Sequence, residues 1–468
     1  MATFFCPGCT QRECRIGELE KSNARLQAEC ERLKAQLDEA QRSSKRQAAP
    51  FSKGEPKKNP RSTARPKGAA YGKHGQRLPP PADQIDQTLE APLPEHCPFC
   101  GGDIAEEDEV DSQYQEDIPV KPRRRLILIH KGTCRACGRR VHGRHPVQTS
   151  AAVGAAASQI GPNAQAAIVS LNKKAGLSYG KIVDHFRDTY GLHLTRSACA
   201  QIVLRASRRL QPAYEEIQQH LRQARHLSPD ETGWRLGGRL VWLHGWVADD
   251  GATAFAIDPR RSGEVLQAVI GIGWSGSMTH DGYSTYDTRF AQAGHQQCVG
   301  HVLRRAHTMA ENATGRAKDF PRQVIALFQD ALKVRDQFLA GHLSQQKLLS
   351  AHEHYNERLA KLSYRPRRNE ANDSLAQHLY NHTGSWFLFL ADPSIPATNY
   401  RGEQALRGPI VNRKVWGGNR THAGKEAQEV ISSVLATCTK RALRAADFIK
   451  QAICGFVGSL FSVLPHRD

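Results

Sequence analysis

The sequence has no long apolar run and comparatively few acidic residues, and each shortage excludes a class of protein. No segment approaches the ~20 consecutive apolar residues that a membrane-spanning helix needs, and the tail QAICGFVGSLFSVL is too short. The start, MATFFCPGCTQREC, lacks the basic and apolar regions of a secretory signal. We therefore expect a cytoplasmic protein with no membrane partner.

The shortage of acidic residues leaves a large positive charge. The 468 residues include 65 Lys or Arg against 46 Asp or Glu, a net charge of +19. The basic residues are clustered, which indicates a polyanionic partner, with nucleic acid as the natural candidate. The length suits about three domains, so we expect a multidomain protein.

Twelve cysteines without an export signal predict reduced thiols or metal ligands in place of disulfides. One CxxC pair lies in CPFCGG, and a second lies in CRACGRR after the strand-like RRLILIHKGT. Each pair turns two thiolates toward one ion, and the glycines behind them supply unusual backbone angles. Four sulfurs close a tetrahedral site, so the sequence predicts a zinc ribbon whose structural Zn²⁺ is held by Cys97, Cys100, Cys134 and Cys137.

The same region carries a basic stretch without acids from Ile118 to Val183. It predicts contact between the ribbon and DNA phosphates. The alternative is a scaffold whose charges only keep it soluble. The residues expected to make the contact are Arg123, Arg124, Arg125, Arg139 and Arg140.

Apolar residues recur in heptads from Ile16 to Leu37, with the polar Asn23 inside the seam. This pattern predicts a short parallel coiled coil that joins chains into a homodimer or a higher oligomer. The alternative is a lone amphipathic surface helix. Three cysteines upstream could bind metal but lack an evident fourth ligand: Cys6, Cys9 and Cys14.

Residues 41–82 hold eleven Lys or Arg and a single acid, Glu55, among Pro, Gly and Ser. A segment of this composition cannot bury enough apolar surface to order itself. It predicts a flexible basic tether that contacts phosphates, and the alternative is an inert solvated linker.

Two segments further on have helical spacing of apolar residues, SYGKIVDHFRDTY and TRSACAQIVLRASRRL, with Thr195 placed as an N-cap. Separated by GLHL, they are typical of a helix-turn-helix. Two packed helices are also common in any helical domain. If the second helix reads DNA, its contacts would come from Arg196, Arg205, Arg208 and Arg209.

The central region changes to strands. HLSPDETGWRL, GRLVWLHGWVAD and TAFAIDP alternate apolar and polar residues and predict an antiparallel meander. The helix SGEVLQAVIG and the strand of SGSMTHDG follow, which matches the ribonuclease-H-like order, in which the first and fourth strands end side by side. Asp230 and Asp281 would then meet, and two adjacent carboxylates favour Mg²⁺ between them.

Between Asp281 and a third acid, Glu403, lies a region of helical pattern, notably RQVIALFQDALKVRDQFLAG and SQQKLLSAHEHYNERLAKL. In a ribonuclease-H-like fold this is a helical insertion. Cys298 and His301, at CxxH spacing, are accessory candidates that bind metal or organise the active site. The alternative is a structural pair near a strand end.

These features resemble the DDE transposases of the insertion-sequence 66 (IS-66) family over nearly the whole chain. The resemblance lies in the leucine heptads, the CPFCGG and CRACGRR module, DETGW, HDGYSTY, the segment CVGH followed by Arg304 and Arg305, and the stretch NYRGEQALRGPIVNRKVW. Thr398 stands where the family usually has Asp, and Gln404 where it has Arg. The resemblance implies that Asp230, Asp281 and Glu403 are the catalytic acids.

The implied activity is metal-dependent cleavage of phosphodiester bonds at the ends of an element, followed by strand transfer into target double-stranded DNA. The three acids would hold two Mg²⁺ or Mn²⁺ ions. Further phosphate contacts are expected from Arg407, one helical turn after Glu403, and from Arg413 and Lys414 beyond a helix break at Gly408-Pro409. The family also implies a bacterial, nucleoid-associated protein and leaves helper proteins of the same element open as partners.

Two alternative functions remain open, a catalytically silent DNA-binding regulator derived from a transposase and a ribonuclease-H-like nuclease without strand transfer. The predicted fold is multidomain α/β, with a coiled coil, a zinc ribbon, a helix-turn-helix-like domain and a ribonuclease-H-like core with a helical insertion. The expected boundaries are 1–40 for the dimerisation helix, 41–90 for the basic disordered linker, 91–148 for the zinc ribbon, 149–224 for the helical DNA-binding domain, 225–309 for the first part of the core, 310–392 for the helical insertion and 393–468 for the core completion with the catalytic glutamate and C-terminal helices.

Overall fold

The computed structural model describes residues 15–33, 79–89, 94, 96, 100–103, 112, 114–115, 121–153, 159–365 and 367–462. The chain divides into two compact units, residues 1–122 and 123–468. In the first unit, residues 15–33 form a helix and η2 spans Ala82–Gln84. The leucines of the first helix are exposed, and the predicted coiled coil stays a prediction. Most of the predicted linker, the end of the heptads, and Cys6, Cys9 and Cys14 lie outside the described residues.

The second unit begins with a two-stranded antiparallel hairpin, β1 (Lys131–Thr133) and β2 (Arg140–His142). The prediction of a strand over RRLILIHKGT is mostly wrong, because only the last three residues of this segment pair with β2. Leu126 is 87% exposed and Leu128 is 75% exposed, so no second layer packs on that segment. An apolar alternation stabilises a strand only where one face is covered.

A helical layer follows, formed by α2 (Pro162–Lys173), α3 (Tyr179–Tyr190) and α4 (Arg196–Gln223). Thr195 caps α4 by accepting a hydrogen bond from the Ala198 amide at 3.0 Å, as predicted. The helix α4 has 28 residues and buries one face from Cys199 to Leu221 in the main core. The helix α2 had no counterpart in the sequence-based prediction, because its small residues carry a weak apolar period.

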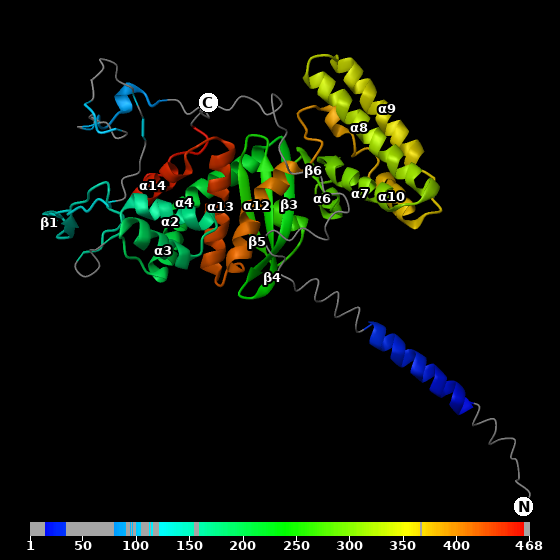
Figure 1. Cartoon of the computed structure of the whole chain (residues 1–468), viewed down its shortest axis with the longest axis horizontal. Helices are drawn as coiled ribbons and strands as arrows, with labels where there is room; N and C mark the ends of the chain where they lie inside the picture. The colour runs from blue at the N-terminus through cyan, green and yellow to red at the C-terminus, as the bar shows by residue number, and fades with distance from the viewer. Residues whose placement is uncertain are drawn as a thin grey trace, which may run out of the picture. The chain divides into compact units, whose positions relative to one another are not determined.

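The sheet has five strands, in the order β5-β4-β3-β6-β7. The strands are β3 (His226–Leu236), β4 (Arg239–Ala248), β5 (Thr253–Asp258), β6 (Ser277–His280) and β7 (Gly294–Gln297). The first three are antiparallel, whereas β6 runs parallel to β3 and β7 parallel to β6. The protein is therefore mixed α/β, mostly helical with a mixed sheet, and the predicted meander and neighbouring fourth strand are observed (Figure 1).

Two short helices connect the strands of the parallel half, α5 (Gly263–Ile270) and α6 (Ser284–Arg289). After β7 the chain forms α7 (Val299–Asn312), η4 (Gly315–Lys318), α8 (Asp319–Leu339), α9 (Gln345–Ser363), α10 (Glu370–Asn381) and α11 (Leu388–Ala391). These helices have an apolar core of their own, built around Phe328, Trp386 and Phe387. The region predicted as a helical insertion is thus helical and separately packed.

The last helices are α12 (Tyr400–Trp416), α13 (His422–Lys440) and α14 (Ala445–Cys454). The predicted break at Gly408-Pro409 is wrong, because α12 runs through both residues. Pro409 is buried inside the helix, so packing of its ring offsets the backbone hydrogen bond that proline cannot make. A further packing site is Leu406, which joins Trp234, Leu243 and Phe255 in an apolar cluster on one face of the sheet.

The helix α13 satisfies the open edge of β5. The amides of Thr253, Phe255 and Ile257 donate to the side chains of Thr437, Ser433 and Glu429 respectively, at 3.0, 2.9 and 2.5 Å. Four helical residues advance by about 6 Å and two strand residues by about 6.6 Å, so the two periods match. An edge strand covered in this way cannot pair with another chain.

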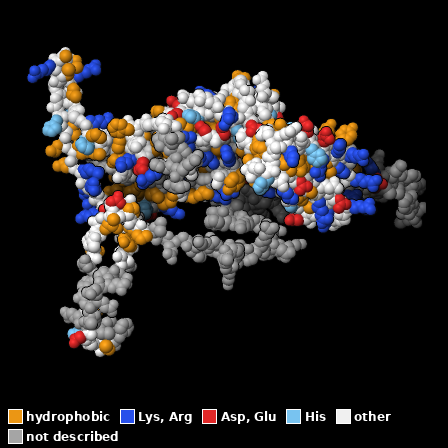
Figure 2. All heavy atoms as spheres, turned by 90° about the horizontal axis from the view of Figure 1, so that it is seen from above, with side chains coloured by type: hydrophobic (Ala, Val, Ile, Leu, Met, Phe, Trp, Pro, Cys, Tyr) orange, Lys and Arg blue, Asp and Glu red, His pale blue; other side chains and the backbone are white. Residues whose placement is uncertain are grey.

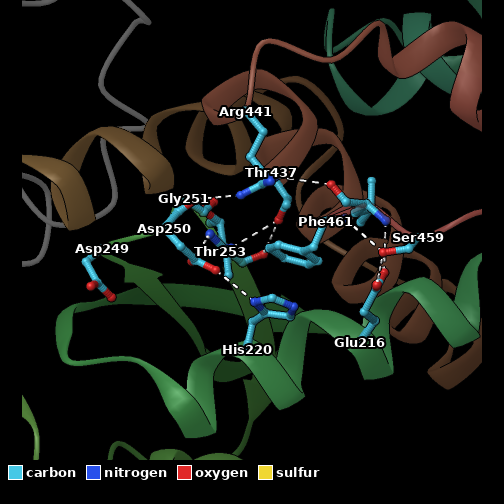
Figure 3. A network of polar contacts seen from close by, with 12 residues as sticks. Glu216, His220, Asp249, Asp250, Gly251, Thr253, Thr437, Arg441, Ser459 and Phe461 are labelled. Carbon is cyan, nitrogen blue, oxygen red and sulfur yellow. Dashed lines mark hydrogen bonds and ion pairs between the residues drawn. The ribbon is translucent and has the colours of Figure 1, made fainter. Parts of the chain in front are cut away.

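A polar network connects the C-terminal segment to α4 and to the turn that precedes β5 (Figure 3). Arg441 donates to the carbonyl oxygens of Leu460 at 3.1 Å and Asp250 at 3.0 Å, and its guanidinium lies over the Phe461 ring. Phe461 stacks on His220, which contacts Asp250 at 2.8 Å. Among the helices that the structure describes, none is long and apolar enough to cross a bilayer.

Candidate active site

Asp230 lies within β3, directly opposite Gly245 of β4. The expectation that it ends a strand is wrong, because β3 continues to Leu236. The pairing between β3 and β6 does end nearby, because Leu227 is the last residue of β3 that pairs with β6. Asp230 lies four positions before Trp234 in the strand. Side chains an even number of positions apart share one face, so both point to the face covered by α12.

Burial raises the pKa of Asp230 to about 7, and the charges of Glu231, Asp281 and Glu403 also raise it. The side chain receives a hydrogen bond from the Glu231 amide at 2.9 Å, which acts in the opposite direction. A carboxyl group with these neighbours carries uncompensated negative charge when it ionises. The structure therefore brings all three predicted acids into one electrostatic neighbourhood.

Asp281 directly follows the last residue of β6, as predicted, and is exposed. Its Oδ1 accepts a hydrogen bond from the amide of Tyr283 at 3.2 Å, and Gly282 between them has φ of 89°. The loop therefore turns sharply and leaves the carboxylate at the rim of the sheet. The left-handed backbone at Gly282 explains why glycine follows the aspartate.

Glu403 lies in the first turn of α12, where its charge is favoured by the helix dipole. Asn399 begins that helix and does not cap it with its side chain. Its side-chain Nδ2 instead donates to the carbonyl oxygen of Pro229 at 2.7 Å. One side chain thus fixes the start of α12 against the residue that precedes Asp230.

Gly402 allows this close approach between helix and strand. A Cβ at Gly402 would lie 2.8 Å from Asn399 Oδ1 and 2.9 Å from the carbonyl oxygen of Ser228. Both distances are shorter than real Cβ contacts, and the second involves backbone that cannot move freely. The glycine before Glu403 is therefore a packing requirement of the site.

Glu403 has two neighbours that carry nitrogen donors, one of them the Arg304 guanidinium. Arg304 Nη2 lies 3.1 Å from Glu403 Oε1, and His301 Nε2 lies 3.5 Å from the same oxygen. Cys298, His301 and Glu403 each offer a ligand atom within 4.8 Å of the others. The Cys298 thiol accepts a hydrogen bond from the Asn399 amide at 3.1 Å, so it also holds the start of α12.

A fourth acid, Glu231, was not predicted. Its side chain is 2% exposed and points to the opposite face from Asp230, where Arg261 lies 2.9 Å from Oε1 and Tyr286 donates to Oε2 at 3.0 Å. Burial raises the pKa of Glu231, and the charge of Asp281 adds to that effect. The DETGW motif contains this residue, but its partners are distant in sequence and give no local signal.

Most basic residues predicted to contact DNA are exposed. These are Arg123, Arg124, Arg125, Arg139, Arg140, Arg196, Arg205, Arg208, Arg407 and Lys414. Arg413 is half-buried instead, with Nη1 donating to the carbonyl oxygen of Gly233 and contacting Thr232 Oγ1 at 3.4 Å. Arg209 donates to the carbonyl oxygen of Thr149 at 2.9 Å. Lys and Arg side chains are widely spread over the face shown in Figure 2.

The second cysteine knuckle has the predicted turn. The Cys134 amide donates to Arg139 O at 2.8 Å, the Gly138 amide donates to Cys134 O at 2.9 Å, and Gly138 has φ of 67°. Hydrogen bonds from the Cys137 and Ala136 amides lower the pKa of the Cys134 thiol, which favours the thiolate that binds metal. Cys97 lies outside the described residues, and Cys100 belongs to the other unit.

The architecture and the site define a mixed-sheet α/β protein with convergent carboxylates on one face of the sheet and at its rim. The sequence model described as "Transposase IS66 family" matches residues 157–427, more than half of the chain. The chain therefore belongs to the IS66 family of transposases. An uncharacterised protein of Sinorhizobium fredii, y4hP, is 26% identical over 405 residues, which are 77% of this chain and 70% of the relative.

Proposed function

We propose that this protein is a DDE transposase with a ribonuclease-H-like core, which cuts DNA at the ends of its element and joins the freed ends to target DNA. The observation that carries the proposal is the neighbourhood of Asp230, whose pKa is raised to about 7 by burial together with the charges of Glu231, Asp281 and Glu403. Three carboxylates from β3, from the end of β6 and from α12 are an unfavourable arrangement unless a cation joins them.

Mg²⁺ fits this donor set. It prefers oxygen ligands and retains several waters, and Asp230, Asp281 and Glu403 offer only carboxylate oxygens. Burial and the neighbouring carboxylates raise the pKa of Asp230, and a bound cation would stabilise its ionised form. When bound, such ions lower the pKa of a water and stabilise the charge that develops on the leaving 3′ oxygen.

The chain's own residues hold the carboxylates in position and place a positive charge beside them. Asn399 and Gly402 hold Glu403 against β3, so the carboxylates keep a fixed spacing as DNA enters. Arg304 pairs with Glu403 at 3.1 Å while its side chain is 62% exposed. The same guanidinium can therefore bind a scissile phosphate once a cation takes over the charge of Glu403.

The exposed basic residues described above bind DNA phosphates in this proposal. The α3–α4 pair and the hairpin of β1 and β2 contribute to recognition of the DNA. We also propose a structural Zn²⁺ bound by Cys97, Cys100, Cys134 and Cys137. A further prediction is self-association of the chain through residues 15–33. The exposed leucines of that helix favour a partner helix. The protein would act on bacterial DNA in the cytoplasm.

The deciding experiment incubates the full chain and Mg²⁺ with DNA that carries the ends of its own element, and maps nicks and joined products. Asp230→Asn, Asp281→Asn and Glu403→Gln should each reduce cleavage by at least about 10³-fold while DNA binding is retained. Cleavage by these variants at the wild-type rate would refute the assignment. A wild-type protein that binds the ends and leaves them intact would instead be a regulator, and cleavage without joining would be a nuclease.

A further inference from the structure

A second group of metal-ligating side chains lies beside Asp281 and is not used by the proposed chemistry. His280 ends β6, Asp287 belongs to α6 and His295 belongs to β7. Each offers a ligand atom within 4.8 Å of the others. His280 is fully buried and the His295 side chain is 11% exposed, so these are not surface histidines that happen to be near an acid.

The distances match the edges of a tetrahedral site. His280 Nε2 and His295 Nδ1 share a hydrogen bond of 3.1 Å, and Asp287 Oδ1 lies 3.5 Å from each of these nitrogens. Ligand atoms around tetrahedral zinc, at bonds of about 2.0 to 2.1 Å, are about 3.4 Å apart. The triangle is therefore already close to the size that one cation requires.

The surroundings of the triangle contain polar atoms without partners. Among the described residues, Asp287 Oδ2 and Gln297 Oε1 are buried and accept no hydrogen bond. Gln297 is 1% exposed, and its Nε2 lies 3.5 Å from Asp287 Oδ1 and 3.2 Å from His382 Nδ1. His382 Nδ1 is in turn 3.9 Å from Asp287 Oδ2. Buried acceptors of this kind are costly unless a further group satisfies them.

The outer contacts suit a metal-binding imidazole. His295 donates from Nε2 to the Phe290 carbonyl oxygen at 2.9 Å, which leaves a lone pair on Nδ1 facing the triangle, as ligating histidines commonly do. For His280, the Gly282 amide approaches Nδ1 at 3.3 Å. That contact is near the limit of a hydrogen bond, so it can be given up when the His280 proton moves to Nδ1 and Nε2 binds.

We propose that His280, Asp287 and His295 bind a first-row divalent cation such as Zn²⁺, with His382 or a water as the fourth ligand. Imidazole donors select such ions over Mg²⁺, so this site is chemically distinct from the catalytic one. The cation holds both ends of the loop that carries Asp281 and joins them to His295 of β7. It is a positioning device for Asp281, and only this positioning role rests on the proposed function.

Zinc content tests the site without reference to DNA cleavage. The full chain, without a histidine tag, is purified as wild type, His295→Gln, Asp287→Asn and the control His244→Gln, which changes another buried histidine outside the cluster. We expect one zinc fewer per chain in the first two variants and no loss in the control. Equal zinc content in all four folded proteins overturns the proposal.

X-ray absorption at the zinc edge supplies a test that needs no variant. Wild-type protein stripped by a chelator and refilled with Zn²⁺ should show zinc bound by nitrogen and oxygen in addition to any bound by sulfur. Spectra with sulfur ligands alone overturn the proposal, even if the variants fail to fold. If the site is correct and Asp281 is catalytic, His295→Gln also reduces cleavage; zinc loss with unchanged cleavage removes only the positioning role.

Discussion

The Asn399 side-chain amide donates a 2.7 Å hydrogen bond to the carbonyl oxygen of Pro229. Asn399 precedes α12, and Pro229 precedes Asp230 in β3. The bond joins two segments that are 170 residues apart in sequence. It therefore sets the distance between Asp230 and Glu403, which local sequence cannot do.

Gly402→Ala should disrupt this contact. The added Cβ would meet Asn399 Oδ1 at 2.8 Å and Ser228 O at 2.9 Å, so the start of α12 must move away from β3. We expect a loss of stability of about 1 to 3 kcal/mol, as for other overpacked sites, and a loss of cleavage of at least about tenfold, because catalytic geometry tolerates little displacement. Thermal unfolding and a cleavage assay measure the two effects.

Gly408→Ala is the matched control, because it lies in the same helix and a Cβ there meets nothing within 4 Å. Alanine is favoured over glycine within a helix by about 1 kcal/mol. The control should therefore be at least as stable as wild type and fully active. Equal behaviour of the two alanine variants would contradict the role given to Gly402.

Asp230→Asn should stabilise the metal-free protein at pH 8. The folded pKa of about 7 lies above that of an unfolded aspartate, so stability is lost as pH rises through the folded pKa and the ionised form is the unfavourable one. Removing the charge should raise the free energy of unfolding by on the order of 2 kcal/mol at pH 8, and by little at pH 4. Denaturant unfolding at the two pH values measures this difference.

Divalent metal should reverse that ranking. Mg²⁺ added at pH 8 is expected to raise the unfolding temperature of wild type and to have little effect on Asp230→Asn, since binding requires the ionised carboxylate. If Asp230→Asn is less stable than wild type without metal, burial and the neighbouring charges do not destabilise the ionised Asp230 carboxylate.

Lys173 should give the stability a second dependence on pH. Burial lowers its pKa to about 7, although its Nζ donates to Gln428 Oε1 at 2.8 Å and lies 5.4 Å from the centre of the Trp416 ring. Between pH 7 and about 10 the unfolded chain binds a proton here that the folded chain lacks, so the free energy of unfolding rises with pH by up to about 1.4 kcal/mol per unit.

Lys173→Met lacks this titration. The stability of wild type relative to Lys173→Met should therefore increase between pH 6 and pH 9, by about 2 kcal/mol. Urea unfolding of both proteins at the two values measures the change. A difference that does not vary with pH would show that Lys173 remains protonated in the folded protein.

Ser433→Ala tests the covered edge of β5. Ser433 Oγ accepts from the Phe255 amide at 2.9 Å and is fully buried, so the substitution leaves a buried donor without an acceptor. We expect a loss of about 1 to 3 kcal/mol. Thr439→Ala in the same helix removes a hydroxyl that donates only to Leu435 O and should cost less than about 1 kcal/mol. Similar losses would mean that the strand edge finds another partner.

Much of the sheet was predictable because β3, β4 and β5 each alternate over enough residues to define a face. The acids were predictable in part, since Asp281 follows a strand and Glu403 begins a helix. The position of Asp230 was not, because the length of a strand depends on its neighbours: β3 continues along β4 after its pairing with β6 has ended.

The supporting residues had no local signal. Asn399, Gly402 and Arg304 lie in the segments that carry the family resemblance, but their roles depend on contacts made across the fold, which no local pattern predicts. The helix break expected at Pro409 failed for a related reason, because burial of the ring stabilises the helix beyond its intrinsic preference. The strand expected from RRLILIHKGT failed for the opposite reason, because its exposed leucines have no covering layer.

The order of segments along the chain has a consequence for damaged copies of the gene. Glu403 and the asparagine that docks its helix are translated after all five strands of the large sheet and the whole helical insertion. A polypeptide that stops early still carries both aspartates and much of the basic surface, but it lacks the last carboxylate. Because α13 is missing as well, the amides of Thr253, Phe255 and Ile257 lose their acceptors, so such a fragment exposes a strand edge that is open to aggregation.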